Sequence, residues 1–156
     1  MEQRINAFAK GANAMKSLYG LGMYLSKSSV EQHLLNLVYF RVSQVNGCAY
    51  CLDMHAKDLR ANDETEQRLY MLNAWRDSPV YSNRERAALA WAESVTKLDN
   101  NNVPDDVYKA AINEFSEAEL IDLTLAVIAI NSYNRINIAF RTKAGDYVPG
   151  QHAVRA

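Results

Sequence analysis

SEAELIDLTLAVIAINSYNRINIAF, residues 116 to 140, decides the fold class of this chain. Ser116 and Glu119 have the spacing of a capping box, in which each side chain accepts a hydrogen bond from the other residue's backbone N–H. No proline or glycine interrupts the segment before Phe140. This pattern predicts one long helix. From Leu120 to Ile130 the helix is apolar nearly all round, so we expect it at the centre of the domain or in a subunit interface.

Helical periodicity dominates the rest of the chain as well. We expect further helices over residues 31–45, 48–60, 65–77, 83–98 and 103–115, and a surface helix near the N-terminus. No strand pattern competes with these segments. The sequence therefore predicts an all-α fold, a single-domain helical bundle over residues 1–156. The last sixteen residues, 141–156, hold two glycines and a proline and are expected to run over the surface as an irregular tail.

The ends of these helices carry recognisable signals. Ser28 or Ser29 can cap the helix that begins near residue 31, and Asn83 can cap the helix expected over residues 83–98. Asn46-Gly47 is a helix-stop signal because both residues tolerate a left-handed backbone. We therefore expect the chain to turn at Gly47 and to start a new helix at about Cys48.

Composition excludes several classes of protein. The chain has 156 residues, 49% of them apolar and 22% charged, with 17 Lys and Arg against 18 Asp and Glu. A balance of this kind is typical of an ordinary globular domain and gives no polybasic surface for nucleic acid or anionic lipid. The longest apolar run, 123–130, is too short for a membrane span. The N-terminus lacks the apolar core of a secretory signal, so we expect a cytoplasmic protein.

The only two cysteines lie in NGCAYCLDMHAKDLR, residues 46 to 60. On a helix, Cys48, Cys51 and His55 share one face within two turns. Gly47 places both thiols in the first helical turn, where free backbone amides and the helix dipole stabilise a thiolate. Cys-x-x-Cys at a helix start is a known route to a low thiol pKa. His55 could take the proton of Cys51 or hold its thiolate as an ion pair.

Two other interpretations of the motif stay open. Zinc needs four ligands, or three and a water molecule, and two thiols and a histidine on one two-turn helix make a poor tetrahedral cage. The remaining histidines, His33 and His152, lie elsewhere in the chain. Alternatively, both thiols are small core residues and His55 lies at the surface. We favour redox chemistry, with no metal and no cofactor.

The segment RVSQVNGCAYCLDMHAKDLR, residues 41–60, resembles the core motif of the carboxymuconolactone decarboxylase and alkylhydroperoxidase D-like family. ERAALAWAE at 85–93, FSEAEL at 115–120 and INSYNR at 130–135 resemble segments of its two-cysteine, peroxidase-related branch. The likeness covers about residues 30–140. It implies an all-helical fold, assembly as a homo-oligomer (trimer or hexamer), and reduction of hydroperoxides through a dithiol–disulfide cycle that an external thiol reductant renews. Lactone decarboxylation is disfavoured because the decarboxylases lack the cysteine pair.

Carried over residue by residue, the resemblance makes Cys48 and Cys51 the redox pair and His55 the relay histidine. Two positions depart from the family pattern, since Asn36 stands where a glutamate is usual and Tyr50 where a histidine can occur. An amide cannot shuttle a proton as a carboxylate does.

Glu93 is the candidate proton relay in place of that glutamate, because it lies in the apolar helix segment ALAWAESV. The alternative is that Glu93 lies at the solvent edge of this helix. Asn131, Asn134 and Arg135 are polar groups in another apolar helix, and either bridge subunits or line the pocket over the thiols.

The sequence thus predicts a thiol-dependent peroxidase in which a thiolate attacks the peroxide and becomes a sulfenic acid, which the second cysteine condenses to a disulfide. We favour Cys51 as the attacking residue, because His55 lies one turn away, and Cys48 as the resolving one. Apolar neighbours of the motif (Leu37, Val38, Phe40 and Val42) favour an organic hydroperoxide. The alternative is a redox-sensing oligomer that is oxidised slowly and stoichiometrically, without peroxide turnover.

Overall fold

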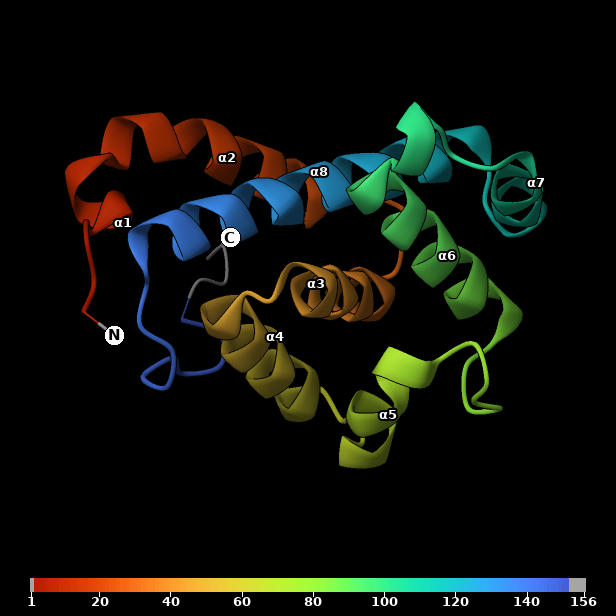
Figure 1. The fold of residues 1–156 in the computed structure, drawn as a ribbon, viewed down its shortest axis with the longest axis horizontal. Coiled ribbons are helices and arrows are strands. Elements are labelled where there is room, and N and C mark those ends of the chain that lie inside the picture. The colour runs from red at the N-terminus through yellow and green to blue at the C-terminus, as the bar shows by residue number, and fades with distance from the viewer. Residues whose placement is uncertain (1, 152–156) are drawn as a thin grey trace.

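The computed structural model describes residues 2–151, and the predicted all-α fold is confirmed, with helices and no strand in that range (Figure 1). The α-helices are α1 (Ala7–Lys10), α2 (Ala12–Leu25), α3 (Gln32–Asn46), α4 (Ala49–Ala61), α5 (Glu66–Met71), α6 (Asn83–Lys97), α7 (Asp105–Glu114) and α8 (Glu117–Phe140). Two short 3-10 helices, η1 (Leu72–Ala74) and η2 (Asp99–Asn101), follow α5 and α6. None of these helices is both long and apolar enough to cross a membrane.

The helix α8 is the central element, as its apolar sequence predicts. It begins with the expected capping box between Ser116 and Glu119. It packs against α2, α3, α4, α6 and α7, and Figure 1 shows α2 running alongside it. Leu123 and Val127 are fully buried, whereas Ile121 and Ile128 on the outer side are about half exposed, at 61% and 48%. The helix therefore fills the core with one side and leaves an apolar stripe on the other.

The turn between α3 and α4 positions the cysteine motif. Gly47 adopts the left-handed conformation, φ 70°, and its N–H donates to the carbonyls of Gln44 and Ser43. This is the helix stop that Asn46-Gly47 predicts. Cys48 then occupies the N-cap of α4, with an extended backbone, and Cys51 lies in the first turn.

Two of the predicted N-caps are wrong. The first residue before α3 is Glu31, whose side chain makes no cap hydrogen bond, so neither Ser28 nor Ser29 caps this helix. Ser82 rather than Asn83 caps α6, because Glu85 three residues later completes a capping box with it. The segment predicted as a helix over 65–77 is shorter, since the backbone tightens into η1 after Met71.

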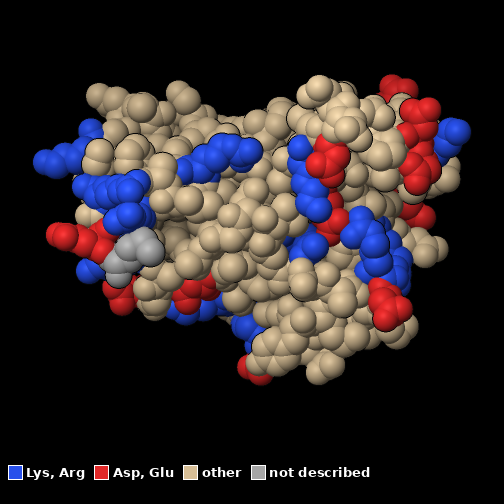
Figure 2. All heavy atoms as spheres, in the orientation of Figure 1, with Lys and Arg blue, Asp and Glu red and all other residues tan. Residues whose placement is uncertain are grey.

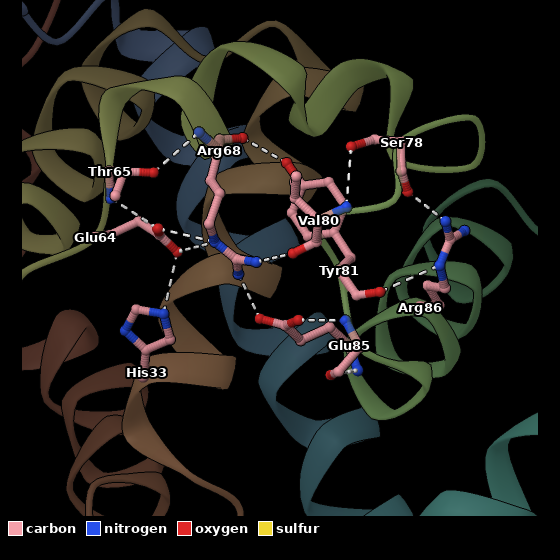
Figure 3. Close-up of polar contacts among 10 residues, drawn as sticks. His33, Glu64, Thr65, Arg68, Ser78, Val80, Tyr81, Glu85 and Arg86 are labelled. Carbon is pink, nitrogen blue, oxygen red and sulfur yellow. Dashed lines mark hydrogen bonds and ion pairs between the residues drawn. The ribbon is translucent and has the colours of Figure 1, made fainter.

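A polar network fixes the connection between α4 and α6 (Figure 3). The guanidinium of Arg68 lies between the carboxylates of Glu64 and Glu85, with N–O distances of 2.9 and 2.5 Å, and it also bonds the Val80 carbonyl. Glu64 is only 3% exposed and also pairs with His33 of α3 at 3.1 Å. These contacts join α3, α5 and α6 where the chain has little regular structure.

The described residues after α8 are mostly exposed, as expected for an irregular tail, and they also dock on the surface of α4. They form no helix between residues 142 and 151. Lys57 donates to the carbonyls of Gly145 and Tyr147. Tyr147 is buried, at 7% exposure, and its hydroxyl donates to Asp58. Gly145 N–H bonds Asp53. Residues 152–156, including His152, lie outside the described part of the chain.

Surface charges of both signs lie among one another. On the face drawn in Figure 2, acidic and basic side chains gather toward both ends, and the middle is largely uncharged. This distribution agrees with the near-balance of 17 basic and 18 acidic residues.

Candidate functional site: a buried cysteine pair

The two thiols lie in direct contact at the start of α4. Both cysteines are free, and their Sγ atoms are 2.7 Å apart. Each residue is only 1% exposed and belongs to the main hydrophobic cluster. The helix start thus brings together Cys48 and Cys51 as the sequence predicts, but in a closed and apolar setting.

The environment shifts the pKa values of the two thiols in opposite directions. The pKa of Cys48 is lowered chiefly because Cys51 donates its S–H to the Cys48 sulfur, which outweighs the opposing effect of burial. The backbone amides of Cys51 and Tyr50 and the side chain of Asn134 contribute less. The pKa of Cys51 is raised because it shares its proton with Cys48 and because it is buried. One negative charge on the pair therefore resides on Cys48.

This result opposes the order of roles that the sequence favours. The interpretation there gave the attack to Cys51 because His55 lies one turn away. In the structure Cys48 is the N-cap residue, closest to the positive end of the α4 dipole. The thiolate is the reactive species, so the pKa directions favour Cys48 as the nucleophile.

His55 lies on the buried side of α4, one turn beyond Cys51. It is 6% exposed, and its ring lies 5.3 Å from the ring of Tyr39. Within residues 2–151 neither ring nitrogen has a hydrogen-bond partner. Burial lowers the pKa of His55 to about 3, so its imidazole is neutral at physiological pH. A neutral ring can accept a hydrogen bond from a thiol, but it does not hold a standing positive charge.

Two asparagines of α8 face the pair, and one of them escaped the sequence analysis. Asn137 is 4% exposed and donates from Nδ2 to Cys51 Sγ at 3.3 Å. Asn134, fully buried, bonds Ser43 and accepts from Asn46, both of α3. The signal for Asn137 was its position three residues after Asn134, on the same side of an apolar helix.

Asn131 has a bridging role between helices, and Arg135 supports it from the same helix. Asn131 donates to Thr96 of α6 and accepts from Asn46 of α3. Arg135 bonds the side chain of Asn131 at the surface. Within the described chain Asn131 therefore joins α3, α6 and α8, Arg135 bonds within α8, and neither side chain bonds a sulfur.

Glu93 lies in a buried ion-pair cluster, neither at the solvent edge nor against the cysteines. It is 5% exposed and accepts hydrogen bonds from Arg41 at 2.7 Å and from Trp75 Nε1 at 2.8 Å, and it pairs with Arg76 at 2.7 Å. Burial alone would raise its pKa, but the bonds from Trp75, Arg41 and Arg76 together hold that pKa below its usual value. Its role as a proton relay stays a prediction, and its contacts favour a structural role.

The two positions that depart from the family pattern supply no carboxylate. Asn36 is half-buried on α3 and makes no side-chain hydrogen bond within residues 2–151. Tyr50 is half-buried beside the pair, and burial raises the pKa of its hydroxyl. In the described chain the polar side chains near the sulfurs include Asn134, Asn137, His55 and Tyr50, none of which is a carboxylate.

The apolar neighbours divide between two clusters. Val38 and Val42 pack in the cluster that holds the cysteines, whereas Leu37 and Phe40 pack in a second cluster with Trp75. In the described part of the chain, no three His, Cys, Asp or Glu side chains are arranged to hold a metal ion. The pair is thus surrounded by hydrocarbon and amide groups.

Comparison with known proteins identifies the family of the chain. Residues 10–94 match the Carboxymuconolactone decarboxylase family. The uncharacterised protein YdfG of Bacillus subtilis (strain 168) is 40% identical over 144 residues, which are 92% of this chain and 98% of YdfG.

Solved structures show the same fold. A protein of unknown function from Agrobacterium tumefaciens, named as an AhpD antioxidant defence protein, is 37% identical and superposes with a TM-score of 0.89 over 94% of this chain and 100% of its own. An uncharacterised peroxidase-related protein with an AhpD core, from Ralstonia eutropha JMP134, is 16% identical with a TM-score of 0.80, covering 96% of this chain and 80% of its own. The chain therefore belongs to the carboxymuconolactone decarboxylase family and has the AhpD-like fold.

Proposed function

We propose that this protein is a thiol-dependent peroxidase that reduces hydroperoxides through Cys48 and Cys51. The observation that carries the proposal is the contact between two free thiols, 2.7 Å apart, of which Cys48 has a lowered pKa. Two thiols at this distance need only a small movement to form a disulfide, whose S–S bond is about 2.05 Å long. The reduced pair is therefore prepared for a two-electron oxidation.

The first step is attack of the Cys48 thiolate on the terminal oxygen of the hydroperoxide. The S–O bond forms as the O–O bond breaks, and the terminal OH group stays on the sulfur, so that Cys48 becomes a sulfenic acid. The other oxygen leaves as an alkoxide, which takes a proton from water to become the alcohol. In the second step the Cys51 thiolate attacks the sulfenic sulfur and releases hydroxide, which takes up the Cys51 proton as water. An external dithiol then returns two electrons and two protons by thiol–disulfide exchange.

The setting of the pair favours small or apolar peroxides. Each cysteine is 1% exposed and lies among aliphatic side chains, including Val38 and Val42. A charged substrate would lose its hydration on entering such a site, whereas an organic hydroperoxide would lose less. We therefore expect an organic hydroperoxide to be preferred.

The decisive experiment is consumption of cumene hydroperoxide in the presence of excess dithiothreitol. The wild type is expected to consume many equivalents and Cys48→Ser none beyond the uncatalysed rate, whereas Cys51→Ser, which keeps the attacking thiol but lacks the resolving one, is expected to consume at most about one equivalent and then stop. Turnover that survives either substitution would overturn the dithiol mechanism.

Burial of the pair supports a second candidate, a redox sensor. Both sulfurs are shielded from solvent, and such a pair could be oxidised once per molecule and change assembly rather than turn over. Under this alternative, the same assay would consume one equivalent of peroxide and then stop despite excess dithiothreitol.

A further inference from the structure

Asn137 holds an unusual place beside the cysteine pair. Its Nδ2 lies 3.3 Å from Cys51 Sγ, and its Oδ1 is buried without a hydrogen-bond partner among residues 2–151. The carboxamide of asparagine has a donor, Nδ2, and an acceptor, Oδ1, on the same carbon, and rotation about the Cβ–Cγ bond exchanges their positions. The side chain can therefore accept a hydrogen bond from a Cys51 thiol and donate one to a Cys51 thiolate.

His55 adds two further unpaired polar atoms on the buried side of α4, four residues after Cys51. Both of its ring nitrogens are buried and lack partners in the described chain. Buried polar groups in folded proteins are nearly always paired, and exceptions call for an explanation. Here three unpaired atoms belong to two residues, His55, which lies one turn beyond Cys51 on α4, and Asn137, which contacts Cys51 from α8.

The second step of the proposed cycle needs groups of this kind. When the reduced pair loses one proton, the negative charge resides on Cys48, whose pKa Asn134 helps to lower. Once Cys48 has become a neutral sulfenic acid, the repulsion that kept Cys51 protonated is gone. Cys51 must then lose its proton, carry the negative charge and attack, while a hydroxide leaves Cys48. In this step a hydrogen-bond donor to the Cys51 sulfur stabilises the thiolate, and a neutral proton acceptor can take up the Cys51 proton.

We infer that Asn137 is a catalytic residue of the disulfide-forming step, in which it donates a hydrogen bond to the attacking Cys51 thiolate while neutral His55 passes the Cys51 proton to the departing hydroxide. The atoms balance: the S–H bond of Cys51 and the S–O bond of Cys48 break, the S–S bond forms, and water leaves. This inference rests on the proposed peroxidase cycle. Asn134, one turn before Asn137 on α8, lowers the pKa of both cysteines, whereas Asn137 acts on Cys51.

The test follows a single turnover. Reduced protein is mixed with one equivalent of cumene hydroperoxide, quenched at intervals with dimedone, and mapped by mass spectrometry. The wild type is expected to form the disulfide with little trapped sulfenic acid. Asn137→Leu is expected to consume peroxide at the wild-type rate but to form the disulfide about ten- to a hundredfold more slowly, the loss expected for a hydrogen bond to a charged group. Dimedone should accumulate on Cys48.

Two further variants keep the test sharp. Asn137→Asp retains the shape and polarity of the site but places a carboxylate against the developing thiolate, so it should also delay the disulfide and not the attack. Asn131→Leu makes the same substitution two turns away, where the amide contacts α3 and α6 and neither sulfur. It should form the disulfide at the wild-type rate.

The outcomes separate the two claims. Disulfide formation at the wild-type rate in both Asn137 variants, or dimedone on Cys51 in place of Cys48, would overturn the inference and leave the peroxidase proposal standing. Failure of the wild type to consume peroxide or to form the disulfide would overturn the proposed function itself.

Discussion

The charge on Cys48 depends on the Cys51 thiol more than on any other neighbour. Donation of the Cys51 S–H is the largest cause of the lowered Cys48 pKa, ahead of the amides at the start of α4. The helix start alone is therefore insufficient to explain the activation of this thiol. The pair activates itself through its short sulfur–sulfur contact.

This dependence predicts different effects for two substitutions of Cys51. Cys51→Ala removes the donor, so the pKa of Cys48 should rise toward that of an ordinary thiol. Cys51→Ser keeps a hydroxyl donor at the same position and should retain most of the lowering. The pH dependence of thiolate absorbance, measured on each single-cysteine variant, distinguishes them. Equal Cys48 pKa values in both variants would assign the activation to the helix start.

His55 makes stability depend on acid. Burial lowers its pKa to about 3 from an ordinary value of 6.5. Between these values the unfolded chain binds a proton that the folded chain excludes, so the free energy of unfolding rises with pH through this window. The contribution is complete above about pH 6.5, and by pH 5 roughly 2 kcal/mol of it is lost.

Urea unfolding at pH 7.5 and pH 5 tests this prediction. His55→Phe removes the titrating group and fills the same apolar space, so its loss of stability on acidification should be smaller than that of the wild type by about 2 kcal/mol. All other titrating groups are common to both proteins and cancel. An equal loss in the two proteins would show that His55 does not titrate as a buried neutral ring.

At the scale of the helices, Glu93 connects α3, α6 and the turn after η1. Its three partners are Arg41 on α3, Trp75 and Arg76. Arg41 is itself 8% exposed and also bonds Asn73 and Gln44. This cluster joins segments that lie far apart in the chain. Its widest span, from Arg41 to Glu93, is 52 residues.

The prediction for Glu93→Gln is a structural defect without a catalytic one. The substitution leaves the buried guanidinium of Arg41 without its countercharge, so stability should fall by about 3 kcal/mol. Thiol alkylation at each pH should match the wild type, because no polar contact of Glu93 reaches the cysteines. A shifted pH profile of thiol reactivity at unchanged stability would instead establish Glu93 as the proton relay.

The helices that the sequence predicts best are those whose signals are local. The capping box of Ser116 and Glu119 and the left-handed Gly47 each depend on a few neighbouring residues, and both are confirmed. The tail is different, because its docking on α4 depends on distant residues. Tyr147 contacts Lys57 and Asp58, which lie 90 and 89 positions earlier in the chain. Irregular segments have no periodicity from which such a contact could be read.

The same distinction applies to the site. Cys48, Cys51 and His55 belong to one helix, so their spacing alone places them together. Asn137 contacts Cys51 from 86 positions away, and nothing in the spacing of α4 predicts which residue of α8 faces it. The partners of Glu93 were missed for this reason too, since burial and pairing between distant elements are tertiary properties.

For the whole molecule, the outer stripe of α8 is an unexplained apolar surface. Ile121 and Ile128 are 61% and 48% exposed, and the partly buried Leu125 lies between them on the same side. Residues spaced by four and three form a continuous line on a helix. We propose this stripe as a contact between subunits of a homo-oligomer, in agreement with the assembly that the family resemblance implies.

Ile128→Glu tests this contact. A carboxylate in an apolar interface is costly to bury, so the variant should dissociate toward the monomer. Light scattering coupled to size-exclusion chromatography gives the mass directly. Ile112→Glu on α7, where the side chain is 44% exposed, is the matched control and should keep the wild-type mass. An unchanged mass for Ile128→Glu would place the interface elsewhere.

The central claim is that one hydroperoxide molecule oxidises the Cys48–Cys51 pair to an intramolecular disulfide. The most direct measurement is peptide mapping of the reduced protein after addition of one equivalent of cumene hydroperoxide, with and without later dithiothreitol. The account predicts a linked Cys48–Cys51 peptide that has lost two hydrogen atoms and that dithiothreitol converts back to free thiols. Cysteines that remain unchanged, or that gain oxygen without forming the link, would contradict it.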